Sequence, residues 1–281
     1  MAQDEAASRM AAQRDAFLRV VAERRALMGI LNVTPDSFSD GGRFVGRDAA
    51  IAQAKKLVAD GADIVDVGAE STRPGHTPIT AEEECRRLAP LLDPLLGAVD
   101  APFSIDTYKA ATAHYAVERG VCVVNDVWGL QKDPAMADTV AETGAAVVVM
   151  HNRDSVDPAL DIVADMRGFF DRSLDLARRA GIPRARVLLD PGIGFGKTKE
   201  QNLAALRATD RLLTEYGLPV LIGVSRKSLF GLLLGAAVDA RLIGTLAANL
   251  AAAARGARVF RVHDVAEHRA GFAVWDAIDH G

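Results

Sequence analysis

The 281-residue sequence is poor in cysteine and in aromatic side chains. Its two cysteines, Cys85 and Cys122, have no metal-type spacing, and one bridge between them would be a thin framework for a chain of this length. Hydrophobic residues reach 49% although aromatic residues make up only 5%, which is the composition of a folded globular protein and not of a disordered one. Two isolated thiols fit a reducing compartment best, so we expect a cytoplasmic location.

The sequence also lacks a large charge excess and a long apolar run. Its formal net charge is −4 and it contains no basic block, so nucleic acid is not expected as a partner. No apolar stretch reaches the ~20 residues of a membrane-spanning helix. The Ala-rich stretch 246–256 is interrupted by Asn249 and Arg255, and no membrane partner is expected.

Residues 1–26 form an N-terminal extension that carries charges throughout and lacks the apolar segment of a signal peptide. We expect an amphipathic helix or a frayed end there, and the sequence indicates no function for it. The remaining chain, residues 27–281, has no linker and no break in composition, so it is expected to form a single domain.

This domain alternates short apolar runs with longer Ala-rich segments at helical spacing. Continuous apolar strands between helices are typical of a parallel sheet covered on both faces. Eight such runs favour an α/β fold of the (β/α)8 TIM barrel type behind the helical extension, with an open doubly wound sheet as the alternative. The predicted strands are 27–32, 63–68, 102–106, 121–126, 146–151, 186–190, 219–224 and 258–262.

Nearly every predicted strand ends on polar or charged residues. In a parallel barrel the carboxyl ends of all strands open on one rim, where active sites lie. One polar strand end is explained by capping of the next helix, but the recurrence at eight ends predicts a polar mouth. The residues concerned are Asn32, the stretch 66–70, Asp106, Asn125 with Asp126, Met150 with His151, Asp190, the run 225–227, and Arg261 with His263.

Two features of the sequence could suggest nucleotide binding or a zinc site, but their residue spacing does not match either motif. The segment DPGIGFGKT at 190–198 resembles a phosphate loop, yet Pro191 stands where the pattern requires Gly. The histidines are scattered, and the first strand ends on Asn32 without the His pair of a zinc-dependent barrel hydrolase. Neither P-loop nucleotide binding nor a zinc site is therefore expected.

Eight segments together resemble the dihydropteroate synthases, the folate-pathway branch of the pterin-binding barrel family. Enzymes of this family join 6-hydroxymethyl-7,8-dihydropterin diphosphate to 4-aminobenzoate, forming 7,8-dihydropteroate and pyrophosphate. The resemblance implies the same transferase reaction here and a target for sulfonamides. It covers about residues 27–279, in GILNVTPDSFSDGG, DVGAESTRPG, SIDT, VVNDV, VVMH, LLDPGIGFGKT, GVSRKSLFG and RVHDV.

The resemblance implies a pterin site at the mouth of the barrel. Asp190 would accept two parallel hydrogen bonds from the N–C–N edge of the pterin, with Asp106 and Asn125 completing that edge. Lys227 would reach the ring carbonyl, and Arg261 would lie over the ring face. The apolar lining would come from Val127, Met150 and Phe195. The residues expected to be catalytic are Asp106, Asp190 and Lys227.

The resemblance also implies a site for the diphosphate. Asn32 would bind Mg²⁺, which takes oxygen ligands and keeps several waters beside substrate phosphates. Positive groups aimed at the diphosphate would stabilise the charge that develops as it leaves in an SN1-like transfer. Besides Mg²⁺, those groups are Arg73, Arg261 and His263. Positions matching the 4-aminobenzoate pocket are Thr72, Pro74 and Ser225. Whether Asp36 or Asp40 of the first loop assists the metal is left open.

Two alternatives within the barrel family are a pterin-binding methyltransferase with a corrinoid protein partner and a non-catalytic pterin-binding paralogue. The methyltransferase has no diphosphate to bind, so the set of Asn32, Arg73, Arg261 and His263 argues against it. A paralogue should have lost some of the matched residues, and none is missing. Several positions depart from the commonest family sequence: Trp128, Asn152 and, in a variable part of the first loop, Val45 with Gly46.

The resemblance further implies a homodimer. The Ala-rich segment 242–256 is a candidate interface, because small residues let helices approach closely. A buried helix of the outer ring of the barrel is an equally good interpretation of this segment.

Overall fold

The structure is a computed structural model that describes residues 2–33, 42–70 and 77–280. Eight parallel strands form one sheet in the order β6-β5-β4-β3-β2-β1-β8-β7. A parallel bridge between Leu189 and Val220 joins β6 to β7 and closes the sheet, which confirms the barrel and excludes the open sheet. The strands are β1 (Ala26–Asn32), β2 (Ile64–Gly68), β3 (Phe103–Asp106), β4 (Val123–Asp126), β5 (Ala146–Met150), β6 (Val187–Asp190), β7 (Leu221–Ile222) and β8 (Val259–Val262).

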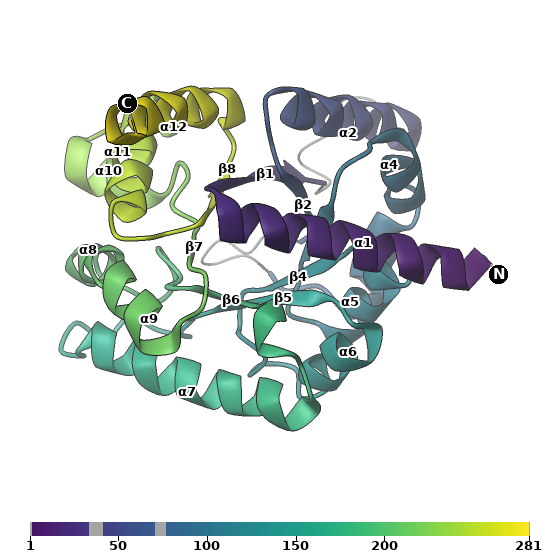
Figure 1. Cartoon of the computed structure of the whole chain (residues 1–281), viewed down its shortest axis with the longest axis horizontal. Helices are drawn as coiled ribbons and strands as arrows, with labels where there is room; N and C mark the ends of the chain where they lie inside the picture. Colours follow the sequence, from purple (N-terminus) through teal and green to yellow (C-terminus); the bar gives the residue numbers. More distant parts are fainter. Residues whose placement is uncertain (1, 34–41, 71–76, 281) are drawn as a thin grey trace.

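Helices surround the strands in an outer ring (Figure 1). The longest of the later helices, α7, is capped at both ends. Asp161 accepts hydrogen bonds from the backbone of Val163 and Ala164 at its start, and Gly181 ends it with a left-handed φ of 86°. The helices are α1 (Ala2–Glu23), α2 (Gly42–Ala59), α3 (Ala81–Leu88), α4 (Leu92–Ala98), α5 (Ala110–Val117), α6 (Met136–Thr143), α7 (Ile162–Ala180), α8 (Lys199–Arg207), α9 (Thr209–Tyr216), α10 (Ser228–Leu234), α11 (Leu242–Ala253) and α12 (Val265–His280).

The strands are apolar along their whole length because both of their faces are covered. Every residue of β5 is buried, and β2, β3, β4 and β6 are buried throughout as well. Each predicted strand is present, and only β7 is much shorter than expected. Cys85 and Cys122 are free thiols. The cytoplasmic location that we expected from them stays a prediction.

The N-terminal extension is an ordered helix that closes the amino end of the barrel. Phe17 and Val21 of α1 belong to the core cluster. Arg14 Nη1 donates to the carbonyl of Gly144 at 2.5 Å and Gln13 Nε2 to that of Ala101 at 3.2 Å, in the turns that precede β5 and β3. The helical extension is thus confirmed, while the boundary at residue 26 stays a prediction.

None of the helices in the described ranges combines the length and the apolar character needed to cross a membrane.

The packing of α1 predicts a stability effect. Phe17→Ala should lower the free energy of unfolding by about 3–5 kcal/mol, because it removes an aromatic ring buried in the core. Arg19→Ala, on the exposed side of the same helix, should change this free energy by less than about 0.5 kcal/mol. Urea unfolding followed by circular dichroism measures both. Equal midpoints for the two variants would mean that α1 does not contribute to the core.

Candidate active site

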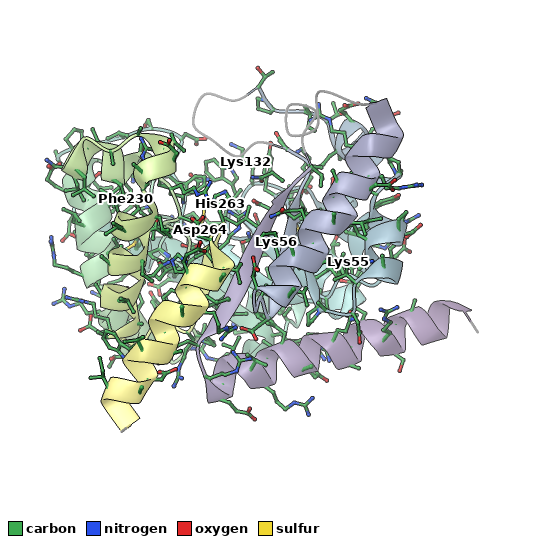
Figure 2. All side chains as sticks on the ribbon, turned by 90° about the horizontal axis from the view of Figure 1, so that it is seen from above. Lys55, Lys56, Lys132, Phe230, His263 and Asp264 are labelled. Carbon is green, nitrogen blue, oxygen red and sulfur yellow. The ribbon has the colours of Figure 1, made fainter. Side chains whose placement is uncertain are left out.

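The carboxyl ends of the strands bring the polar residues of the sequence to one mouth. Asp106 pairs with Asn125 across β3 and β4, and Met150 pairs with Asp190 across β5 and β6. Figure 2 shows His263 toward the end of the barrel opposite to that crossed by α1. The predicted convergence of strand ends is therefore observed.

Arg261 of β8 is shared between two buried carboxylates. Its Nε donates to Asp66 Oδ2 at 2.5 Å and its Nη2 donates to Asp106 Oδ2 at 2.7 Å. Asp66 is fully buried and accepts two further hydrogen bonds, from the hydroxyl of Ser104 and from Asn125 Nδ2 at 3.3 Å. One guanidinium is therefore the shared cationic partner of a cluster drawn from β2, β3, β4 and β8.

Asp106 has an acceptor oxygen to spare. Its Oδ1 is buried and has no hydrogen-bond partner within the part of the chain that the structure describes. Burial raises the pKa of the Asp106 carboxyl to about 7, although the Arg261 guanidinium beside it acts in the opposite direction. A buried acceptor without a donor is costly, so this oxygen is suited to receive an N–H group from a ligand.

Asp190 and Lys227 face the same part of the mouth. A methyl group placed on Gly223 would lie 3.4 Å from Asp190 Oδ2 and 4.0 Å from Lys227 Nζ, so the small residue leaves room for both groups. The other oxygen, Oδ1, accepts a hydrogen bond from the backbone N–H of Gly192 at 2.7 Å. Asp190 therefore stabilises the following turn and also belongs to the site.

The charges of this pair depend on burial. Burial lowers the pKa of Lys227 to about 8, with Asp190 opposing the shift. Burial also raises the pKa of Asp190, with Lys227 opposing that shift. Lys227 donates to the carbonyl of Ile193, and its Nζ lies 4.4 Å from the centroid of the Phe195 ring. The ammonium is thus held by an acceptor and an aromatic face from the β6–α8 loop.

Asn32 ends β1 beside Asp106. A methyl group on Gly68 would lie 3.7 Å from Asn32 Oδ1 and 3.8 Å from Asp106 Oδ2. Asn32 is exposed, so its carboxamide oxygen is open to a ligand at the rim. No group of three or more His, Cys, Asp and Glu side chains that could hold a metal ion occurs among the described residues.

Ser225 and His263 form a pair on the other side of the mouth. Ser225 Oγ lies 2.9 Å from His263 Nδ1, and the backbone N–H of His263 donates to the same oxygen at 3.2 Å. Arg226, between Ser225 and Lys227 in the sequence, has a left-handed φ of 56° and forms a two-point ion pair with Asp264. The ion pair with Asp264 fixes the run 225–227 against the start of α12.

Asn152 and Trp128, which depart from the commonest family sequence, make local contacts. Asn152 Nδ2 donates to the carbonyl of Val127 at 2.8 Å, so it ties the chain after β5 to the chain after β4. The Nζ of Lys132 lies 4.3 Å from the centroid of the Trp128 ring, above a partly buried side chain. Val127 and Met150 themselves are buried, as expected for an apolar lining.

Several predicted residues lie outside the described ranges. These are Thr72, Arg73 and Pro74 of the second loop and Asp36 and Asp40 of the first. Their proposed roles rest on the resemblance alone.

Sequence reasoning placed Asp66 at the mouth only as part of the polar stretch 66–70 and gave it no role, and it did not name Ser104. Asp66 is an acidic residue inside an otherwise apolar strand, and this was the available signal, because a buried carboxylate in a strand needs a partner. Ser104 faces Asp66 in register across β2 and β3 and gives no signal in the sequence.

A closed barrel of parallel strands with buried carboxylates and cations at its mouth defines an α/β-barrel enzyme that binds a small polar ligand. The family model described as "Pterin binding enzyme" matches residues 28–263. The chain therefore belongs to the pterin-binding enzymes, as the sequence segments indicated. One curated relative, the dihydropteroate synthase of Clostridium beijerinckii, is 43% identical over 259 residues, which cover 92% of this chain and 96% of the relative.

Solved structures agree with this family. The dihydropteroate synthase of Clostridium difficile, crystallised in the presence of pteroic acid, superposes with a TM-score of 0.88 at 46% identity, covering 92% of this chain and 98% of that one. The enzyme of Xanthomonas albilineans with 4-aminobenzoic acid gives a TM-score of 0.87 at 42% identity, covering 92% and 94%.

The shared guanidinium predicts the consequence of removing one carboxylate. Asp66→Asn should lower the free energy of unfolding by about 3 kcal/mol, because breaking a buried ion pair on one side is strongly destabilising. The control Asp60→Asn removes a pair with Lys56, whose side chain is 64% exposed. It should cost less than about 1 kcal/mol. Urea unfolding at pH 7 compares them, and equally small losses would show that Asp66 does not hold Arg261.

Proposed function

We propose that this chain joins 6-hydroxymethyl-7,8-dihydropterin diphosphate to 4-aminobenzoate, giving 7,8-dihydropteroate and pyrophosphate in folate biosynthesis. Its relatives carry the name dihydropteroate synthase, and two of their structures are described with pteroic acid and 4-aminobenzoic acid. The observation that carries the proposal is the buried Oδ1 of Asp106 without a partner in the described ranges. A pterin offers N–H donors for such an acceptor.

In this proposal the carboxylates recognise the pterin by its donor edge. A carboxylate accepts two parallel hydrogen bonds from an N–C–N group, as it does from a guanidinium. Asp190 takes this role, Asp106 accepts a further N–H, and Asn125 completes the edge. Lys227 binds the ring carbonyl. The ring lies among the apolar side chains of Val127, Met150 and Phe195.

The diphosphate binds at the rim near Asn32. Arg261 uses Nε and Nη2 for the two carboxylates, so Nη1 and its planar face are the parts that serve a ligand. His263 and Arg73 supply further positive or donor groups, and Thr72, Pro74 and Ser225 line the space for 4-aminobenzoate.

Asn32 is the residue that would hold Mg²⁺. Its oxygen suits a hard cation, and with one protein ligand the ion depends on phosphate oxygens and water for the rest of its shell, a common arrangement for Mg²⁺. When bound, Mg²⁺ supplies positive charge against the leaving diphosphate.

The reaction exchanges one bond for another. The C–O bond between the pterin methylene and the diphosphate breaks, and its electron pair leaves with the diphosphate. The lone pair of the aryl amine then forms the new C–N bond, and the amine gives up one proton to water. Asp106 and Asp190 stabilise positive charge that develops on the pterin in this SN1-like transfer. The amine attacks as a neutral group, so no strong base is required.

The proposed reaction predicts products and their dependence on two residues. With both substrates and Mg²⁺, the protein should release dihydropteroate, detected by mass, and pyrophosphate in equal amounts. Lys227→Ala and Asp106→Asn should each lower kcat/KM by at least about 100-fold, the size of effect seen for lost electrostatic stabilisation. Lys55→Ala, on the exposed face of α2 (Figure 2), is the matched control and should leave it unchanged. Pterin binding without product would contradict the reaction and favour the paralogue or the methyltransferase.

We also propose that the chain forms a homodimer through α10, α11 and α12. These helices lie together in Figure 1, and α11 packs against both neighbours. They carry most of the exposed large hydrophobic side chains of the described residues, and such a concentration marks an interaction surface. The side chains are Leu232, Leu233, Leu234, Ile243, Val274 and Ile278, with Val238 on the connection between α10 and α11. Within the candidate segment 242–256, one face of α11 is buried and the other is exposed.

Introducing a charged residue on this apolar surface tests the dimer proposal. Ile243, with 80% of its surface exposed, should tolerate Glu in the monomer, so Ile243→Glu should convert a dimer into a folded monomer in analytical ultracentrifugation. Val156→Glu, at a position on the β5–α7 loop that is 52% exposed, should leave the dimer intact. A wild-type monomer, or a variant that remains dimeric, would rule out this interface.

A further inference from the structure

We propose that Lys197 is a positioning residue of the pterin site, which ties the β6–α8 loop to the end of β5 and thereby holds the loop against Lys227. The inference rests on the proposed function, because Lys227 and the loop residue Phe195 are assigned to the pterin there. Lys197 Nζ directs its hydrogen bonds to backbone carbonyls, so it acts through the loop.

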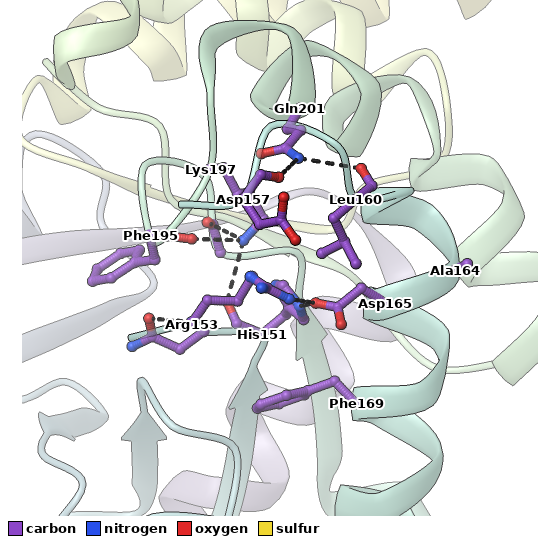
Figure 3. A network of polar contacts seen from close by, with 12 residues as sticks. His151, Arg153, Asp157, Leu160, Ala164, Asp165, Phe169, Phe195, Lys197 and Gln201 are labelled. Atoms are coloured by element: carbon purple, nitrogen blue, oxygen red, sulfur yellow. Dashed lines mark hydrogen bonds and ion pairs between the residues drawn. The ribbon is translucent and has the colours of Figure 1, made fainter. Parts of the chain in front are cut away.

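Lys197 is a buried lysine whose donors are all used inside the protein. Its Nζ donates to the carbonyls of Gly192 at 2.8 Å, Phe195 at 3.1 Å and His151 at 3.5 Å (Figure 3). An ammonium has three N–H donors, and these three carbonyls match them in number, with the contact to His151 the longest. Two of the carbonyls belong to the loop and the third belongs to the chain leaving β5, so the ammonium joins the two segments.

The glycines of the loop make this close approach possible. Gly192 and Gly196 have left-handed φ values of 64° and 57°. A methyl group on Gly192 would lie 1.8 Å from the carbonyl oxygen of His151, and one on Gly196 would lie 2.4 Å from Cβ of Arg153. The motif that resembles a phosphate loop in the sequence therefore serves to pack the loop against β5, with its lysine turned inward.

Burial lowers the pKa of Lys197 to about 7, and the nearby Asp190 carboxylate acts in the opposite direction. Burial lowers the pKa of the adjacent His151 to about 3, and the nearby Lys197 charge adds to that shift, so the imidazole is neutral and does not repel the lysine. His151 Nε2 lies 3.0 Å from Asp165 Oδ2, which also pairs with Arg153 at 2.7 Å (Figure 3). The segment that receives the lysine is thus itself held in place by α7.

The anchored loop touches Lys227 at three successive residues. Lys227 donates to the carbonyl of Ile193, and its Nζ lies 4.4 Å from the Phe195 ring centroid. Between these, a methyl group on Gly194 would come within 3.1 Å of Lys227 Cδ. A displacement of the loop would therefore move both the acceptor and the aromatic face that orient Lys227.

A second anchor holds the other side of the loop. Asn202 of α8 accepts a hydrogen bond from the backbone of Gly194 at 2.6 Å and donates to the carbonyl of Thr198 at 2.8 Å. Without Lys197 the loop would remain attached to α8 while losing its attachment to β5. The expected result is a folded enzyme with a displaced loop, not an unfolded chain.

Hydrogen exchange tests the anchoring without reference to activity. Lys197→Met keeps the length of the side chain and removes its three donors, and Lys197→Gln is a milder variant that keeps two. Lys199→Met is the control, because Lys199 pairs with Glu200 on the surface. In Lys197→Met the amides of residues 192–197 should exchange at least tenfold faster than in the wild type, with the strands of the barrel unchanged. The exchange rates of these amides in Lys197→Gln should lie between those of the wild type and those of Lys197→Met. Unchanged loop exchange rates in Lys197→Met would overturn the proposal.

Kinetics then tests the effect on the site. Lys197→Met should raise KM for the pterin diphosphate at least tenfold and change KM for 4-aminobenzoate less than twofold, whereas a merely structural loss lowers the yield of active enzyme and leaves both constants alone. In a double-mutant cycle with Phe195→Ala, the two effects should be less than multiplicative, because both act through one loop. Independent, multiplicative effects would contradict the proposal. A wild-type protein without turnover would count against the proposed function, while the exchange measurement would still decide the anchoring.

Discussion

The mouth of this barrel depends on one guanidinium held between two buried carboxylates. Asp66 and Asp106 stand on neighbouring strands, and without Arg261 they would be two like charges in the interior. Such a cluster is a poor way to stabilise a fold, because apolar side chains of similar size often serve as well or better. We therefore interpret it as a device for binding, in which Arg261 keeps the carboxylates charged enough to accept hydrogen bonds from a ligand.

The closed topology is what makes the cluster possible. Arg261 on β8 reaches Asp66 on β2 and Asp106 on β3 from the far side of β1, which requires a long side chain directed into the barrel. The same closure places the β6–α8 loop beside Lys227, which follows β7. α1 covers the opposite end of the barrel, so stability at the amino end and chemistry at the carboxyl end are separated.

The sequence was sufficient for the fold and for part of the site. The apolar runs located all eight strands, and their polar ends located Asp106, Asn125 and Asp190, because a residue at a strand end is readable from local pattern. The pairing of Asp66 with Arg261 was missed because the two residues lie 195 positions apart, and only the strand order brings them together. Lys197 was noticed only as part of a failed phosphate loop, since the direction of its side chain depends on the packing of that loop.

The central claim is that Asp106 accepts a hydrogen bond from the pterin as a carboxylate. Its pKa of about 7 in the free protein should fall on binding, because N–H donors favour the charged form. Isothermal titration calorimetry with pteroic acid near pH 6.5 measures the binding enthalpy in several buffers. The dependence of that enthalpy on the ionisation enthalpy of the buffer gives the number of protons released on binding. We predict that the wild type releases a larger fraction of a proton than Asp106→Asn does. Identical proton release by both proteins would contradict the account.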